Sequence, residues 1–210
     1  MGLSFIVKQT PVPPPPSLSV YASDGYLAPL GGQAVWATAR NTPPSLVAVY
    51  TDAGYNSIAT RVFSANYYVT RSFLYFDLSA LPGGATVTSA IVTVRGYTSA
   101  NSQVCIQQGT QTGTDKTGLV IGDWNAFTGT PFSIINWITG SDPRNNFTLD
   151  AAGIAYIESV AGSTAKFCLR EYDSDYSDVA PLNNTDNVNS MYFSASIEAN
   201  WAYITIGYTV

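Results

Sequence analysis

The chain has 210 residues, enough for one substantial core or for one domain with an additional arm. Hydrophobic residues make up 46% and charged residues only 11%, so the polar surface must consist largely of Ser, Thr, Asn, Gln and Tyr. The net charge of −5 argues against a nucleic-acid partner, and no apolar run approaches the roughly 18 residues that a membrane helix needs.

The first element in chain order is a proline-rich segment. It contains the consecutive residues Pro13, Pro14, Pro15 and Pro16. Such a run adopts an extended polyproline II form and cannot join the interior of a sheet. We therefore expect an extended docking arm over residues 1–45, with short strands near residues 18–21 and 34–37. A separate domain is expected over residues 46–210.

From residue 46 onward, strand-like runs alternate with turn signals. The clearest pair lies within residues 71–97, where apolar side chains recur at every second position on both sides of a Leu-Pro-Gly-Gly connection, as in half-buried strands. Strands are expected near residues 46–51, 59–64, 67–77, 86–96, 102–109, 118–122, 132–137, 146–149, 165–171, 189–195 and 201–209. One helix is expected over residues 150–160, with Asp150 as its N-cap. This pattern predicts an all-β, antiparallel jelly-roll-type β-sandwich with one short helix.

Three sequence blocks carry a family resemblance. They are RSFLYFDLSALP at residues 71–82, TSAIVTV at residues 88–94, and CLRE at residues 168–171 followed by two Asp residues. They resemble the DNRLRE-type, disaggregatase-related β-sandwich domains, which occur in phage structural proteins and in secreted polysaccharide-active proteins. The resemblance extends over about residues 46–210. It implies a jelly-roll sandwich with a capacity to bind glycans, and it identifies no ligand.

The residue types available for catalysis are few. The sequence contains no histidine, which excludes Ser-His-Asp and Cys-His mechanisms. A glycosidase needs two facing carboxylates, and no pattern places Glu158, Glu171 or Glu198 opposite an Asp. We therefore expect no enzymatic activity and no cofactor other than a structural calcium ion.

The calcium expectation depends on the acidic run over residues 171–178. Asp173, Asp175 and Asp178 are spaced to supply oxygen ligands to a hard cation. The alternative is a solvated loop in which one Asp pairs with Arg170 at the end of a strand.

Two arginines, Arg71 and Arg170, lie within apolar strand segments. This position is more typical of a buried Arg paired with a carboxylate than of a ligand site. Asp77 and Asp173 are the candidate partners.

Aromatic residues near turns are the candidates for glycan contact, because the CH faces of sugars stack on aromatic rings. These candidates are Trp124, Trp137, Tyr172 and Tyr176. The alternative is that the rings pack within the fold or against a neighbouring subunit. Cys105 and Cys168 lie in strand-like runs and are expected to be buried thiols, with a disulfide between neighbouring strands as the alternative.

Together these features predict a non-enzymatic structural protein of a virion, associated with a capsid, fibre or tail. Its arm is expected to dock onto other assembly subunits in an oligomer, while the sandwich faces outward and contacts polysaccharide. A starting Met without a secretory signal favours the virion. The alternative is a carbohydrate-binding adhesion module of an extracellular cell-surface or filament protein.

Overall fold

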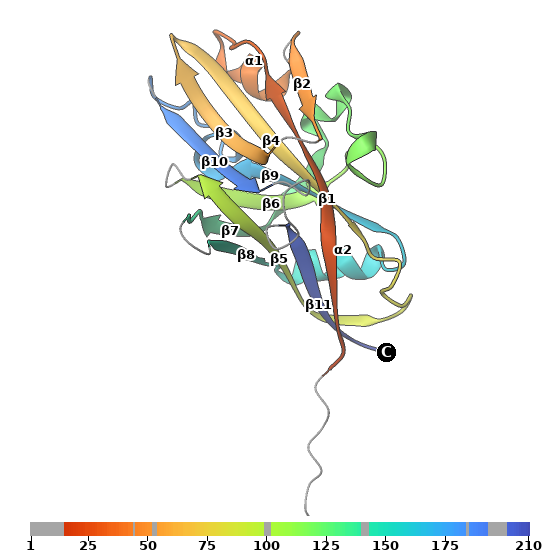
Figure 1. Ribbon diagram of the computed structural model, residues 1–210. Coiled ribbons are helices and arrows are strands. Elements are labelled where there is room, and N and C mark those ends of the chain that lie inside the picture. The colour runs from red at the N-terminus through yellow and green to blue at the C-terminus, as the bar shows by residue number, and fades with distance from the viewer. Residues whose placement is uncertain are drawn as a thin grey trace, which may run out of the picture.

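The structure is a computed structural model that describes residues 15–43, 45–51, 54–98, 102–139, 143–183, 185–192 and 201–210. These residues form eleven strands with short helices between them (Figure 1). The strands are β1 (Ser17–Pro29), β2 (Val47–Tyr50), β3 (Tyr55–Phe63), β4 (Asn66–Asp77), β5 (Thr86–Thr98), β6 (Gln103–Gly109), β7 (Phe127–Asn136), β8 (Arg144–Thr148), β9 (Thr164–Glu171), β10 (Asp186–Tyr192) and β11 (Tyr203–Thr209). The helical elements are α1 (Trp36–Asn41), η1 (Lys116–Gly118), η2 (Ile121–Asn125), α2 (Ala151–Ser159) and η3 (Tyr172–Tyr176).

All strand pairings within the described residues are antiparallel, as predicted for a jelly-roll-type sandwich. One layer contains β8, β5, β11 and the first part of β1. The other contains β7, β6, β9, β4, the second part of β1, and β2. Strands β3 and β10 continue from β4 back to β5, so the two layers are joined at this end.

Strand β1 belongs to both layers and runs along much of the molecule (Figure 1). Its residues 17–21 pair with β11, residues 22–27 pair with β4, and residues 26–29 pair with β2. The expected boundary at residue 45 is therefore wrong for this segment, which is part of the sandwich. Pro15 and Pro16 precede β1 and are exposed, whereas Pro13 and Pro14 lie outside the described residues.

The main core lies between the two layers. Leu74 and Phe76 from β4 pack there with Val92 and Val94 from β5 and with Ile204 from β11. The apolar alternation predicted for residues 71–97 is thereby confirmed for these residues of β4 and β5.

A second cluster covers the other face of β4. It contains Phe73 and Tyr75 of β4, together with Leu27 and Trp124. Strand β4 is consequently buried on both faces rather than half-buried, because η1, η2 and the loops next to them cover its outer side.

Two predicted strands are replaced by helical turns. Residues 36–41 form α1 instead of extending a strand over 34–37, and Gln33 makes only an isolated bridge to Tyr67. The segment near residues 118–122 lies at η1 and η2. There, Asp115 accepts a hydrogen bond from the Thr117 N–H and Asp123 accepts one from the Val120 N–H, which stabilises turns over a strand.

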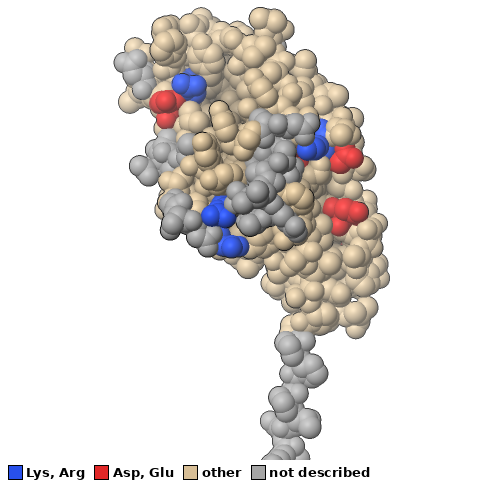
Figure 2. All heavy atoms as spheres, in the orientation of Figure 1, with Lys and Arg blue, Asp and Glu red and all other residues tan. Residues whose placement is uncertain are grey.

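Helix α2 is confirmed, with Asp150 Oδ1 accepting a hydrogen bond of 2.9 Å from the Gly153 N–H. Both cysteines are buried and unbonded to each other, so the thiol prediction is confirmed and the disulfide alternative is wrong. Within the described part of the chain, no helix is long and apolar enough to cross a membrane. On the face shown in Figure 2, charged side chains form a few separate spots among uncharged residues.

Candidate functional site

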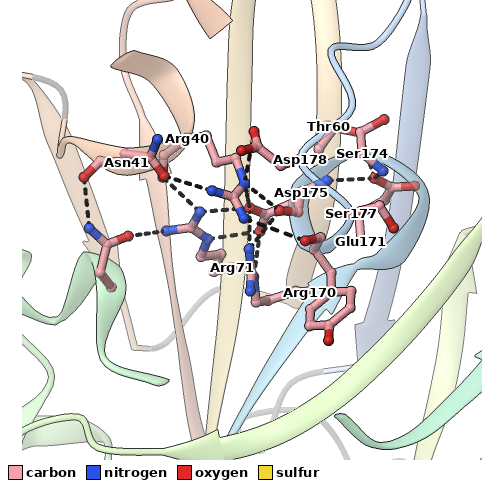
Figure 3. A network of polar contacts seen from close by, with 12 residues as sticks. Arg40, Asn41, Thr60, Arg71, Arg170, Glu171, Ser174, Asp175, Ser177 and Asp178 are labelled. Atoms are coloured by element: carbon pink, nitrogen blue, oxygen red, sulfur yellow. Dashed lines mark hydrogen bonds and ion pairs between the residues drawn. The ribbon is translucent and has the colours of Figure 1, made fainter. Parts of the chain in front are cut away.

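The most concentrated polar network in the described residues surrounds Asp175 of η3 (Figure 3). Its carboxylate is completely buried and accepts hydrogen bonds from two guanidinium groups, each binding through Nε and Nη2. Arg71 donates at 2.8 and 2.6 Å, and Arg170 donates at 3.0 and 2.8 Å. Paired N–H donors that match the two oxygens of a carboxylate make a strong and directional interaction.

The same guanidinium groups connect Asp175 to distant elements. Arg71 of β4 donates to the Trp124 carbonyl of η2 at 2.7 Å and to the Arg40 carbonyl of α1 at 2.8 Å. Arg40 in turn donates through Nε to the Asp175 carbonyl at 2.6 Å. Arg170 of β9 lies over the Phe127 ring, 4.1 Å from its centroid. The network thus joins α1, β4, η2, β9 and η3.

Glu171, at the end of β9, sets the shape of η3. Its Oε2 accepts hydrogen bonds from the Ser174 N–H at 2.8 Å and from the Thr60 hydroxyl at 3.0 Å, and its Oε1 accepts one from the Asp173 N–H at 3.1 Å. These bonds satisfy backbone donors at the start of the turn. They aim the Asp175 side chain at the two arginines.

The pKa values of the two buried carboxyl groups in this network are shifted in opposite directions. Burial alone would raise the pKa of Asp175, but the charges and hydrogen bonds of Arg71 and Arg170 outweigh burial and hold this pKa well below its ordinary value. For Glu171, burial raises the pKa, and the N–H and hydroxyl donors offset only part of the rise. Asp175 is therefore the ionised centre of the network.

The predicted calcium ligands do not come together as a cation site. The oxygens of Asp175 are occupied by the two arginines. Asp173 is exposed and accepts a hydrogen bond from the Gln103 N–H, and Asp178 accepts one from the Trp36 indole at 3.1 Å. Among the residues that the structure describes, no group of three His, Cys, Asp or Glu side chains is placed to hold a metal ion.

Arg71 and Arg170 are buried and paired with a carboxylate, as expected, but the predicted partners were wrong. Asp175, rather than Asp77 or Asp173, bonds both arginines. The loop alternative, in which one Asp pairs with Arg170, is confirmed, but this Asp is buried instead of solvated.

Two of the four predicted glycan contacts are buried. Trp124 is 1% exposed and Trp137 is 2% exposed, so neither ring can stack on a ligand. Trp124 packs instead beside Arg71. Tyr172 and Tyr176 are half-buried and stack on each other with centroids 5.3 Å apart next to the Asp175 network. Glycan contact by these two tyrosines stays a prediction.

A groove that the sequence did not reveal is formed by residues of β10, β3, β4, β1 and β2, and has a volume of about 210 Å³. Apart from one arginine, its described lining residues carry aromatic rings, hydroxyl groups or compact apolar side chains: the lining consists of Tyr26, Ala28, Pro29, Tyr50, Tyr55, Ser57, Ala59, Arg61, Tyr68, Thr70 and Val188. On one side, Tyr26 and Tyr50 stack with centroids 4.5 Å apart.

On the opposite side, Tyr55 stacks on Tyr97 with centroids 5.4 Å apart, and Tyr97 packs edge-on against Tyr192. Tyr55 is 45% exposed, so its ring is partly accessible. Burial, and next the charge of Tyr50, raise the pKa of Tyr26 to about 12, so its hydroxyl stays protonated at neutral pH.

Among the described lining residues there is no carboxylate or thiol, and Arg61 is the one charged group. An open hollow of aromatic rings and hydroxyl groups is suited to holding a ligand by stacking and hydrogen bonds. The groove was missed because its tyrosines come from four separate strands, β1 to β4, and only the strand pairing brings them together.

The fold is an all-β sandwich, and its described residues form a tyrosine-lined groove. In comparisons with known proteins, no family model matches the chain and no curated protein matches it.

Proposed function

We propose that this protein is a non-enzymatic structural protein of a virion whose outward sandwich binds glycans through the tyrosine-lined groove. The observation that carries the proposal is the groove itself. Tyrosine rings offer flat apolar faces for the CH faces of sugars, and the hydroxyl groups of Ser57, Thr70 and the tyrosines offer both donors and acceptors for sugar hydroxyls.

The assembly part of the proposal is supported by the proline-rich segment next to β1 and by the resemblance to domains of phage structural proteins. The scarcity of charged residues, at 11%, also suits extensive contacts with other subunits. A glycan-binding adhesion module of a cell-surface or filament protein is the second candidate, and the same groove favours it.

Glycan binding is tested on an array of bacterial surface polysaccharides and neutral oligosaccharides. Tyr55→Ala should weaken binding about tenfold or more, because it removes an accessible stacking ring. Tyr21→Ala is the matched control, since Tyr21 is 49% exposed and does not line the groove. If nothing on the array binds, or if both variants weaken binding equally, the groove is not a glycan site.

Assembly is tested by deleting residues 1–14, which removes the segment before β1 and leaves the strand pairing intact. The expected result is loss of incorporation into particles with glycan binding retained. Normal incorporation of the shortened chain would contradict docking through this segment. Retained glycan binding by a chain that is found only on a cell surface would favour the second candidate.

A further inference from the structure

The outward face of β3 continues beyond the tyrosine-lined groove. Because side chains alternate between the two faces of a strand, Tyr55, Ser57, Ala59, Arg61 and Phe63 share one face. The first four line the groove, and Phe63, at the far end, is 67% exposed. One strand face therefore carries an accessible aromatic ring at each end, with Ser57, Ala59 and Arg61 between them.

A second hollow of about 220 Å³ adjoins this far end. It is lined by Arg61, Val62, Phe63, Thr185 and Asp186. Arg61 lines both hollows, so its side chain lies between the groove and the second hollow.

Arg61 does not give this surface a net positive charge. Its Nε donates to Asp186 Oδ1 at 2.6 Å, and both side chains are at least half exposed. Among the described lining residues of the two hollows, these are the charged groups, and their charges cancel. An exposed Arg–Asp pair offers N–H donors and carboxylate acceptors to neighbouring hydroxyl groups of an uncharged ligand.

The ligand must bind through side chains. Strand β3 pairs with β10 along residues 55–61 and with β4 along residues 59–63, so an extended peptide cannot be added along the whole row as a further strand. The row from Tyr55 to Phe63 spans eight residue steps, or about 26 Å at roughly 3.3 Å per residue. This length exceeds a single sugar ring and fits an extended chain of several.

We propose that the outer face of β3 is a linear track for an extended, neutral oligosaccharide chain lying along the strand. Tyr55 stacks on one end of the chain, Phe63 stacks on the other, and the Arg61–Asp186 pair binds hydroxyl groups between them. The proposal rests on glycan binding by the groove and adds the direction, the length and the charge class of the ligand.

The length is tested by calorimetric titration with neutral oligosaccharides of one repeating unit and increasing length, chosen from those that bind on the array. For the wild type, affinity should rise with length and then level off. Phe63→Ala should weaken the affinity for the longest oligosaccharides about tenfold and leave the affinity for the shortest ones unchanged. Tyr55→Ala should weaken all of them.

Ile134→Ala is the control, because Ile134 is an exposed apolar residue of β7 away from both hollows. Thermal unfolding of each variant verifies the fold. An affinity that does not depend on length, or a Phe63→Ala variant equal to the wild type at every length, would overturn the track while leaving groove binding in place.

The charge class is tested with uronic-acid oligosaccharides of matched length. The wild type should prefer the neutral series, with affinity changing less than about twofold between low and high salt, because no net charge is neutralised. Asp186→Asn should leave Arg61 unpaired and shift preference toward the uronic acids in a salt-dependent way. A wild type that prefers uronic acids would refute the neutral class.

Absence of any binding, or binding that Tyr55→Ala leaves unchanged, would remove both the proposed function and the track. Binding that depends on Tyr55 but not on chain length or Phe63 would remove the track alone. The two failures are therefore distinguishable in one set of titrations.

Discussion

At the scale of single residues, Asp175 is the centre of a buried network of charged groups. One completely buried carboxylate bonds two guanidinium groups that are 1% and 3% exposed. Burying such a group is costly unless it is paired, so each arginine depends on this carboxylate. The sequence indicated that Arg71 and Arg170 would be buried and paired. It did not indicate the partner, because the position of Asp175 depends on the turn that Glu171 shapes.

Replacing Asp175 by Asn should lower the free energy of unfolding by about 3–5 kcal/mol, because it leaves two buried cations uncompensated. Asp178→Asn is the control. Its side chain is 57% exposed, and an exposed ion pair contributes less than about 1 kcal/mol. Urea unfolding at neutral pH measures both. Equal, small losses would show that the network does not need its central carboxylate.

The pH dependence of stability should separate the two buried carboxyl groups. The pKa of Asp175 is lowered in the folded state, so its contribution is present above its unfolded value of about 4 and is lost as the pH falls further. The pKa of Glu171 is raised, so its contribution is present below an unfolded value of about 4.3 and is lost as the pH rises through the folded pKa.

Wild type and Glu171→Gln should therefore be compared by urea unfolding across the acidic range. The wild type should gain stability relative to the variant as the pH falls from neutral toward about 4, because only Glu171 takes up the proton. Below that value the wild type should lose the contribution of Asp175. Parallel curves for the two proteins would contradict the raised pKa of Glu171.

At the scale of elements, β1 departs furthest from the sequence-based expectation. Only residues 18–21 were expected to form a strand, whereas β1 has 13 residues. The pattern is obscured by Asp24, which is buried, and by Gly25. A Cβ at Gly25 would lie 2.9 Å from Leu119 and 3.0 Å from the Tyr50 carbonyl, so glycine permits a close approach there. Neither residue type is usual in a strand.

Two deletions test the role of β1. Removing residues 1–14 should leave the melting temperature unchanged, because no described pairing involves them. Removing residues 1–29 should prevent folding, because β4, β11 and β2 each lose a hydrogen-bonded neighbour and Leu27 leaves the second cluster. Circular dichroism with thermal unfolding measures both. A folded 1–29 deletion would show that β1 is dispensable.

At the scale of the whole molecule, the sequence was sufficient for the fold class, most strands and α2, because their alternation and capping are local signals. It was not sufficient for the site. The groove depends on Tyr26, Tyr50, Tyr55 and Tyr68 meeting across paired strands, and no local pattern shows which strands pair. The glycan-contact predictions for Trp124 and Trp137 were wrong for a related reason, since the burial of these residues depends on which elements cover them.

The two thiols report on the cooperativity of the whole fold. Cys105 and Cys168 lie in the paired strands β6 and β9, both completely buried, and burial raises the pKa of Cys168 to about 12. A thiol reagent should therefore not react with the native protein, and reaction should appear with global unfolding in urea. Fast reaction under native conditions would reveal local opening of this sheet.

The pairing of β1 with both layers also determines how the protein would respond to mechanical force. Residues 17–21 form the N-terminal end of β1 and pair with β11, whereas Tyr26 and Ala28 of the same strand line the groove. A tether at the N-terminus and a ligand in the groove would thus stretch one continuous strand. Its ladders with β11 and β4 would be sheared along their length, so many hydrogen bonds would resist the tension together instead of opening one after another.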